Sequence, residues 1–376
     1  ISMEKKIFKK LFSEIGLFFL LTSLTLGLII WILQAVNFLD IISEDGHSIG
    51  TYFKFSLLNL PKIISKIILL SFFLSIFYVL VTYDEKNQLL IYWSNGISKN
   101  KFLNKIFIFS FIFIILSFTL SFFIVPFTQD KARSFIRSSS LDFFPALIKP
   151  KQFIDTVENL TIFIDEKENT IIKNLILKDT SNQNNVQLIL AKEGRIINEL
   201  DNKYLVLYDG KIINSSLKNK SAVFNFKETS FNLNKYKTKT TTTPKIQEIK
   251  SLDIINCLIS LTKNKNLYVK FINFNCTNDI YKELSRELYK RAFLPFYIPL
   301  ISIIAGFLVL NSHNNYNYKK SKLIIFLTGI ILIILSQISV NFITEKVMIN
   351  YLILTLLPIL ISISFLFFKI KMKVSS

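Results

Sequence analysis

Several residue types that define whole classes of protein are scarce in this 376-residue chain. Two cysteines are too few for a disulfide-rich scaffold. Only five of the 45 basic residues are arginine, whereas proteins that read nucleic acid favour arginine for bidentate contacts. Acidic residues number 26, which leaves a formal net charge of +19. We therefore expect no nucleic-acid partner, and attribute the excess of lysine either to compositional drift or to an anionic lipid partner.

Catalytic motifs are missing as well. The chain contains no G-x-x-x-x-G-K-[ST] loop for nucleotide phosphates and no G-x-S-x-G nucleophile turn. It has two histidines, His47 and His313, and no H-E-x-x-H zinc motif. Its apolar stretches lack the paired Asp or Ser/His of an intramembrane protease. We expect a chain that is not an enzyme and that binds no metal or cofactor itself.

Long apolar runs, by contrast, are abundant. Hydrophobic residues make up 51% of the chain and the mean hydropathy is +0.43, which excludes a disordered protein. A helix that crosses a membrane needs about 20 consecutive apolar residues. Six runs qualify: 15–36, 63–83, 106–127, 292–310, 323–343 and 351–368. The sequence therefore predicts an α-helical integral membrane protein with six transmembrane helices.

The distribution of lysine indicates how these helices cross the membrane. Short cytoplasmic segments are rich in Lys and Arg. Lysines gather at the N-terminus, in the loops after the second and fourth runs, and in the C-terminal tail. Six spans place these four segments on one side, so we expect both termini in the cytoplasm and the long insert outside. His47 and His313 then lie on opposite sides and cannot share a metal ion. The first run is too long for a signal peptide, and we expect it to be retained.

The insert between the third and fourth runs has the pattern of a β domain. Segments such as 160–165 (LTIFID) and 203–208 (KYLVLY) mix β-branched and aromatic residues with partial alternation. The pairs Glu193-Gly194 and Asp209-Gly210 predict tight hairpin turns. Short strands without a helical period favour an antiparallel sandwich or a jelly roll. The predicted organisation is three spans in 1–127, an all-β, jelly-roll-like domain with a return helix in 128–278, and three spans in 279–376.

The return segment at the end of this insert contains both cysteines. Residues 246–262 have the pattern of an amphipathic helix that leads back to the membrane. Cys257 and Cys276 lie in or beside it, on the oxidising side of the membrane. The sequence leaves open whether they form a disulfide or are two free, buried thiols.

The loop after the second run contains the first of three candidate sites. Leu89, Leu90, Trp93 and Ile97 recur there at helical spacing, and Gly96 follows as a plausible C-cap. Such a short amphipathic helix either lies on the lipid surface or docks into a groove of a partner protein.

Charged residues near the outer ends of the spans form the second candidate. In segment 279–299, Arg286 and Arg291 alternate with acidic residues that include Glu287. This pattern is either a self-paired helix start or a cationic collar for an anionic head group. Lys62 and Lys66 flank the start of the second run, where they either extend towards water or hold a phosphate.

Polar residues within the spans form the third candidate. Gln34 lies near the outer end of the first run, and Gln337 and Asn341 lie in the fifth. Polar side chains inside a membrane face either a neighbouring helix or a cavity.

Four motifs occur along the chain in a fixed order. They are Pro61 at the start of the second span, Glu85 and Leu89 followed by Asn95-Gly96-Ile97-Ser98, Pro150-Lys151-Gln152-Phe153 before the first strands, and Glu287-x-x-x-Arg291-x-x-x-Pro295 at the entry to the fourth span. In that order they resemble the LptF/LptG family, the permease subunits of the lipopolysaccharide exporter. The resemblance covers essentially the whole chain. Lys151 stands where the family has glycine, and the absence of a tryptophan typical of LptG-type members favours LptF.

The resemblance implies a mechanism and a set of partners. A separate LptB-type ATPase dimer would use ATP and Mg²⁺ and receive the coupling helix 85–98, with Glu85, Leu89, Trp93, Gly96, Ile97 and Ser98 as its coupling residues. A homologous LptG permease would complete a cavity for lipopolysaccharide, and LptC-type and LptA-type jelly-roll proteins would receive the lipid in the periplasm. Spans one and five would form lateral gates, with Trp31, Gln34, Gln337 and Asn341 as gate or cavity residues. Lys62, Lys66, Arg286 and Arg291 would contact lipid phosphates.

The resemblance also implies a location, the inner membrane of a Gram-negative bacterium. A different class of function remains open: a membrane assembly or sensor protein that transports nothing and whose β domain binds a ligand. Co-purification with a soluble ATPase would separate the two.

Overall fold

The structure is a computed structural model that describes residues 2–39, 49–139, 150–157, 159–168, 171–182, 185–199, 202–216, 221–232, 245–263, 269–270, 275–310, 318–344 and 347–374. The acidic loop 40–48 with His47, and His313, lie outside these residues. The chain divides into two compact units: residues 1–32, 59–130 and 244–376 form one, and residues 33–58 and 131–243 form the other. We describe each unit separately.

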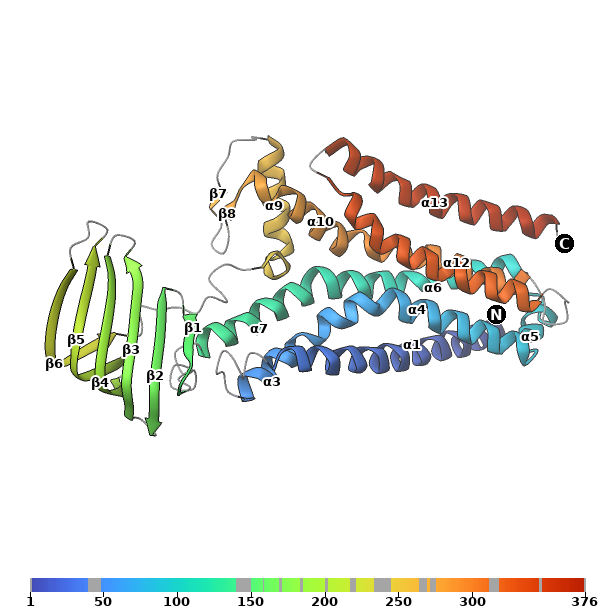
Figure 1. Cartoon of the computed structure of the whole chain (residues 1–376). Coiled ribbons are helices and arrows are strands. Elements are labelled where there is room, and N and C mark those ends of the chain that lie inside the picture. Colours follow the sequence, from blue (N-terminus) through green and yellow to red (C-terminus); the bar gives the residue numbers. More distant parts are fainter. Residues whose placement is uncertain are drawn as a thin grey trace. The chain divides into compact units, whose positions relative to one another are not determined.

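The first unit is built from long apolar helices (Figure 1). Among the described residues, five helical segments are long and apolar enough to cross a membrane: Met3–Asn37, Ile49–Glu85, Lys99–Ile136, Tyr281–Leu310 and Tyr318–Phe342. The sixth predicted run falls within helix α13, Val347–Val374. These segments and the separate antiparallel sheet confirm the predicted fold class, a helical membrane protein with an inserted β domain.

The helices begin and end where local sequence signals place them. Helix α1 covers Ser2–Asn37, α3 Ile49–Leu58, and α4 Leu60–Glu85 with Pro61 in its first turn, where a missing N–H costs nothing. The short α5 covers Leu89–Ser94, and α6 covers Lys99–Thr119 with Ser98 as its N-cap. A π-helical turn, Leu120–Ile124, joins α6 to α7, Val125–Ser139. Residues Leu294–Phe296 and Phe307–Leu310 are 3₁₀ turns on either side of α11, Tyr297–Gly306, and α12 covers Tyr318–Ser339.

The core of the helical unit lies between α4, α6 and α11. Phe72, Phe73 and Phe102 are fully buried there, and Ser75 of α4 donates a 2.6 Å hydrogen bond to the carbonyl of Ile15 in α1. The segments that contain α4 and α11 are the most buried of the five, whereas those that contain α1 and α12 are the least buried. Helices α1 and α12 therefore present broad apolar surfaces that nothing in the described chain covers.

The second unit contains one six-stranded antiparallel sheet. Its strands are β1 (Phe153–Val157), β2 (Leu160–Glu168), β3 (Ile171–Asn182), β4 (Asn185–Glu199), β5 (Asn202–Ser216) and β6 (Ser221–Asn232). They pair in chain order, β1-β2-β3-β4-β5-β6. The inserted domain is thus all-β, and its described strands are connected as a meander, without the Greek-key crossings that define a jelly roll by topology.

Two predicted hairpin turns are wrong. Glu193-Gly194 lies inside β4 and Asp209-Gly210 inside β5, and the pairing of β4 with β5 keeps one register on both sides of Asp209. A Cβ atom on Gly210 would collide with the carbonyl of Leu190 and the ring of Phe226. Glycine at 210 therefore permits a close approach of strands, although Asp209 has the positive φ, 49°, that a turn would also need.

One face of this sheet is apolar. Leu160, Ile162 and Ile164 of β2 alternate along the strand and are at most 1% exposed. They pack with Leu175 and Leu205 from neighbouring strands into one hydrophobic cluster. This period-two pattern is the one the sequence predicts for strands with a single buried face.

The return segment belongs to the helical unit and has its own small core. It comprises a 3₁₀ turn, Ile246–Glu248, helix α9, Ser251–Lys263, two short strands, β7 (Val269–Lys270) and β8 (Asn275–Cys276), and helix α10, Tyr281–Ala292. The predicted return helix is confirmed. Cys257 of α9 and Cys276 of β8 form a disulfide, which resolves the alternative that the sequence left open.

Candidate functional site

A polar cavity lies in the helical unit, at the end where α4 begins and α6 finishes. Its volume is about 350 Å³. Its lining comes from α4, α6, the π-turn, the return segment, α10 and α12, and consists of Lys62, Ser65, Lys66, Leu69, Ser117, Ser121, Val125, Gln247, Glu287, Lys290, Arg291, Leu294, Pro295 and Gln337. Folding thus brings together Lys62, Lys66, Glu287, Arg291 and Gln337, which the sequence predicts as separate candidates.

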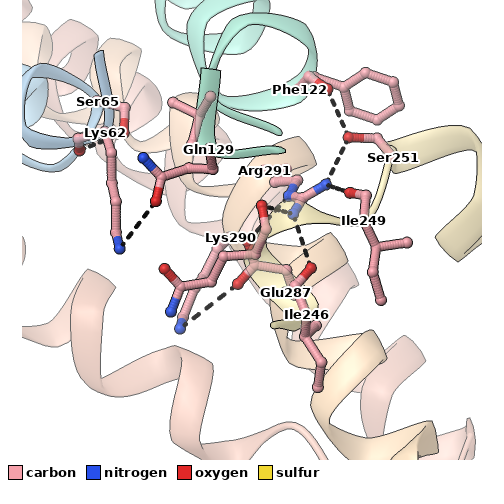
Figure 2. Close-up of polar contacts among 12 residues, drawn as sticks. Lys62, Ser65, Phe122, Gln129, Ile246, Ile249, Ser251, Glu287, Lys290 and Arg291 are labelled. Atoms are coloured by element: carbon pink, nitrogen blue, oxygen red, sulfur yellow. Dashed lines mark hydrogen bonds and ion pairs between the residues drawn. The ribbon is translucent and has the colours of Figure 1, made fainter. Parts of the chain in front are cut away.

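Arg291 in α10 is the most constrained charged residue of this cavity (Figure 2). It is 2% exposed. Its Nε donates to Glu287 Oε1 at 3.0 Å. One terminal nitrogen donates to the Ile249 carbonyl at 2.8 Å and to Ser251 Oγ at 2.9 Å, and the other donates to the carbonyls of Ile246 and Gln247 at 3.3 and 3.0 Å. A guanidinium has five N–H donors, so all five are engaged.

The role predicted for Arg291 therefore needs correction. A lipid phosphate would have to displace acceptors that already satisfy every donor of a buried guanidinium, which is costly. Arg291 instead ties the return segment, through the backbone of 246–249, to α10. Its charge is compensated by Glu287, which lies one helical turn earlier in α10.

Arg286, also in α10, has a similar structural role at a more exposed position. Its Nε donates to the carbonyl of Ile343 at 3.3 Å and a terminal nitrogen donates to the carbonyl of Asn341 at 2.9 Å. These carbonyls follow the C-terminal end of α12, where a cation is favourable. Arg286 does not line the cavity, and the backbone of Asn341, rather than its side chain, makes this contact.

The lysines of the cavity have few intramolecular partners by comparison. Lys62 is half-buried and its Nζ lies 3.5 Å from Gln129 Oε1 (Figure 2). The amide of Gln129 donates to Asn59 Oδ1 at 2.9 Å. Lys66 is exposed. Lys290 approaches Glu287 only to 4.0 Å. With Glu287 committed to Arg291, these three ammonium groups give the cavity a net positive charge.

Residues that the sequence did not single out complete this end of the bundle. Ser251, the first residue of α9, donates a 2.6 Å hydrogen bond to the carbonyl of Phe122 in the π-turn. Ser117 and Ser121 line the cavity one turn apart in the third span. Two serines at i and i+4 within an apolar run are a signal that could have identified them. Nothing in the local sequence pointed to Ser251.

The predicted gate residues occupy different positions. Gln337 of α12 lines the cavity, and its side chain is exposed. Trp31 of α1 does not line the cavity and is half-buried. Gln34 belongs to the second compact unit. Whether these residues gate a lipid path stays a prediction.

The predicted coupling segment 85–98 lies at the opposite end of α4. It is not one continuous helix, because a turn separates the end of α4 from the short helix α5. Helix α4 ends at Glu85, Asn87 adopts a positive φ of 56°, and α5 covers only Leu89–Ser94. Gly96 has φ 75°. Its N–H donates to the carbonyl of Trp93 and the N–H of Ile97 donates to the carbonyl of Tyr92, both at 3.0 Å. This is a Schellman C-cap, so the predicted role of Gly96 in ending the helix is confirmed.

Three of the four residues of the predicted apolar stripe face the chain's own core, and Leu90 does not. Leu89 and Ile97 are each 4% exposed, and Trp93 packs against the same cluster. The side chains left outside are Leu90 and Ile91, which are 59% and 49% exposed. Four polar contacts fix the segment. Tyr92 Oη donates to the carbonyl of Ile7 at 3.2 Å, and Ser98 Oγ accepts from the N–H of Lys101. Two ion pairs add to these, Lys101 with Glu4 at 2.9 Å and Lys322 of α12 with Glu85 at 2.7 Å.

The described residues contain no group of three or more His, Cys, Asp or Glu that could hold a metal ion. The chemistry available to the cavity is therefore hydrogen bonding and charge attraction by lysine, serine and glutamine side chains. Such a set can bind an anionic or polyhydroxylated group, and it offers no nucleophile and base in hydrogen-bond contact.

Long apolar helices and an inserted antiparallel domain place the chain in the class of helical membrane proteins with an inserted β domain. The profile of the lipopolysaccharide export system permease LptF/LptG family matches residues 9–371, and the chain belongs to this family. The chain is also similar to the uncharacterized protein RP871 of Rickettsia prowazekii (strain Madrid E), with 21% identity over 169 residues. That match covers 45% of this chain and 47% of the relative, so the chain spans about half the length of that protein.

Proposed function

We propose that this chain is one of two homologous permeases of an ATP-driven exporter that extracts lipopolysaccharide from the outer leaflet of the inner membrane and passes it to a periplasmic bridge. Family membership carries the proposal. The chain has no P-loop, so a separate ATPase dimer supplies ATP hydrolysis with Mg²⁺. Lysine-rich loops favour an orientation with both termini in the cytoplasm and the β domain in the periplasm.

The second permease and the lipid contact the uncovered faces of α1 and α12. Leu20, Leu24 and Leu28 of α1 are about half exposed, as are Ile331 and Leu335 of α12. Each CH₂ that moves from hydrocarbon into water costs about 0.8 kcal/mol, so an apolar surface must receive the acyl chains as they leave the bilayer, and ATP hydrolysis supplies the work of extraction. These two helices are spans one and five, the lateral gates that the family resemblance implies.

Lipid phosphates are held at the cationic cavity by Lys62 and Lys66. The test is lipopolysaccharide binding and lipopolysaccharide-stimulated ATP hydrolysis by the reconstituted complex. The double substitution Lys62→Gln and Lys66→Gln should weaken lipopolysaccharide binding by at least about tenfold, since each lysine near an anionic surface is worth about 1 kcal/mol. The double substitution Lys319→Gln and Lys320→Gln, at two exposed lysines at the other end of α12, is the charge-matched control. Unchanged affinity in the double variant would refute the assignment of this phosphate site.

The ATPase docks on the exposed side of α5. Leu90 and Ile91 are the apolar side chains available for a groove on the partner, whereas Leu89 is buried in the permease itself. The ion pair between Glu85 and Lys322 supports a route by which movement of α5 reaches α12. Substituting Leu90 and Ile91 by asparagine should abolish co-purification of the ATPase without lowering the thermal stability of the permease. Retention of the ATPase by that variant would contradict docking at α5.

The β domain passes lipid on to soluble jelly-roll partners. Strand β6 pairs only with β5 among the described strands, and Val223 and Phe224 on it are exposed. This edge is suited to adding a strand from a periplasmic partner. Disulfide trapping between cysteines placed on β6 and the partner's edge strand tests that step.

A further inference from the structure

A second cavity lies at the cytoplasmic end of the helical unit, far along the chain from the residues assigned to lipid export. It is an open groove of about 530 Å³ between α1 and α6. Its lining consists of Glu4, Lys5, Phe8, Lys9, Phe12, Ser13, Lys105 and Phe109. None of these residues contributes to the smaller, polar cavity near Lys62.

The floor of this groove is apolar. Phe12 of α1 stacks on Phe109 of α6 with a ring-centroid distance of 4.2 Å, and Phe8, which is 5% exposed, lies 5.7 Å from Phe12. These aromatic pairs join the two helices and leave a surface that attracts hydrocarbon.

The rim is basic, because three lysines outnumber the one glutamate of the lining. Lys5, Lys9 and Lys105 are all exposed. Lys5 and Lys9 are one helical turn apart on α1, so they occupy the same face. Glu4, the acidic residue of the lining, is paired with Lys101 at 2.9 Å. In contrast to Arg291, whose five donors are engaged, none of these three lysines takes part in an ion pair recorded for the described residues.

The depth of the groove matches the head-group region of a membrane. Its lysines immediately precede the apolar runs 15–36 and 106–127, whose helices meet the length and hydropathy of membrane spans. A groove with an aromatic floor and a lysine rim at this depth matches both ends of an anionic phospholipid, with acyl chains against the rings and the phosphate between the ammonium groups. A soluble anion would contact the lysines but would make no apolar contact with the aromatic floor.

We infer that the groove between α1 and α6 binds one anionic phospholipid of the cytoplasmic leaflet, through Lys5, Lys9 and Lys105. The leaflet named rests on the orientation proposed above, but the binding does not depend on lipopolysaccharide or on the ATPase. The bound lipid fills the gap between the first and third spans beside the loop that contains α5, whose Tyr92 contacts the backbone of α1 at Ile7.

Native mass spectrometry of the purified full-length chain tests this inference. The protein is titrated with phosphatidylglycerol and, separately, with phosphatidylcholine of the same acyl chains. We expect one phosphatidylglycerol to bind more tightly than phosphatidylcholine. The triple substitution of Lys5, Lys9 and Lys105 by glutamine should weaken that binding on the order of 100-fold, at about fivefold per lysine.

The matched control replaces Lys6, Lys10 and Lys99 by glutamine. These three lysines lie on the same two helices but do not line the groove, and replacing them removes the same charge. This control should retain the bound lipid. Equal loss in both triple variants would overturn the inference, because it would reduce the effect to net charge. Equal binding of the two lipids by the unaltered chain would also overturn it. So would the finding that the bound ATPase, in lipid-free detergent, protects Lys9 and Lys105 from a reagent that labels amines.

The experiment separates this inference from the proposed function. Lipid binding is measured on the permease alone, so it can succeed even if no lipopolysaccharide is exported. Conversely, the Lys62 and Lys66 variant tests export and leaves the groove between α1 and α6 intact.

Discussion

The hydroxyl of Ser251 donates a 2.6 Å hydrogen bond to the backbone carbonyl of Phe122. Phe122 lies in the π-turn at the end of α6, where the regular i to i+4 bonding of the helix is interrupted and carbonyls need other partners. Ser251 also accepts a hydrogen bond from Arg291 at 2.9 Å. One serine thus links the third span, the return segment and the entry to the fourth span.

Replacing Ser251 by alanine should therefore destabilise the protein by about 2 kcal/mol, since it removes two buried hydrogen bonds and leaves a carbonyl and an N–H unsatisfied. Thermal unfolding in detergent measures the change, and hydrogen exchange should increase at 120–124. Ser260→Ala in the same helix is the control. Its hydroxyl is exposed and bonds only to Asn256 within α9, so stability should change little. An equal loss of thermal stability in both variants would contradict this role, because it would show that Ser251 only stabilises α9 itself.

Arg291→Lys should be strongly destabilising despite the retained charge. Lysine has three donors on one nitrogen and cannot reach acceptors arranged around a planar guanidinium. We expect a loss of about 3 kcal/mol, measured as a lower unfolding temperature of the purified chain. Arg286→Lys serves as the comparison, because that residue is half-buried and donates to two carbonyls. It should cost clearly less, and an equal cost at both sites would contradict the clamp described for Arg291.

Gly96→Ala should destabilise the loop after α4 by about 1 kcal/mol. No atom lies within 4 Å of the position a Cβ would take, so the cost comes only from its φ of 75°. Gly96→Asn should recover part of the loss, because asparagine tolerates this conformation better. The control is Gly16→Ala in α1, which also meets no atom within 4 Å but has an ordinary helical backbone and should gain stability. Differential scanning fluorimetry of the three variants makes the comparison.

Lys151→Gly should stabilise the protein by about 1 kcal/mol. Lys151 has φ 62° and donates its N–H to the carbonyl of Ile164 at 2.7 Å, so the strained conformation is maintained by the edge of the sheet. Glycine adopts this conformation without strain. Gln152→Gly next to it has no positive φ to relieve and should lower stability. A gain for both substitutions, or for neither, would contradict this explanation.

Features set by neighbouring residues could be predicted from the sequence. The six apolar runs, the C-cap at Gly96, the first-turn Pro61 and the return helix all depend on contacts within a few residues along the chain. The same local logic failed at Asp209-Gly210. The dipeptide suits a hairpin turn, but pairing of β5 with strands on both sides extends the strand through it. Long-range pairing outweighs the turn preference, because it satisfies many more backbone groups.

The candidate site was only partly foreseeable. The sequence singled out Lys62, Lys66, Glu287, Arg291 and Gln337, and the cavity contains all five. It did not assign Arg291 correctly, because a charge at the entry to a span suits a phosphate and a carbonyl cluster equally well. The apolar stripe of the cytoplasmic loop was likewise identified, but its buried side is that of Leu89 and its free side that of Leu90 and Ile91.

Hydropathy alone was enough to indicate a membrane protein, because transfer of a 20-residue segment into lipid depends on composition and little else. The tertiary structure decided which charged side chains are engaged in intramolecular hydrogen bonds and which face an open groove. Arg291 and Lys105 both lie beside apolar runs, yet one is surrounded by five acceptors and the other lies on an open groove. Four of the five acceptors of Arg291 come from a segment 40 to 45 residues away along the chain, and folding alone brings them within hydrogen-bond distance.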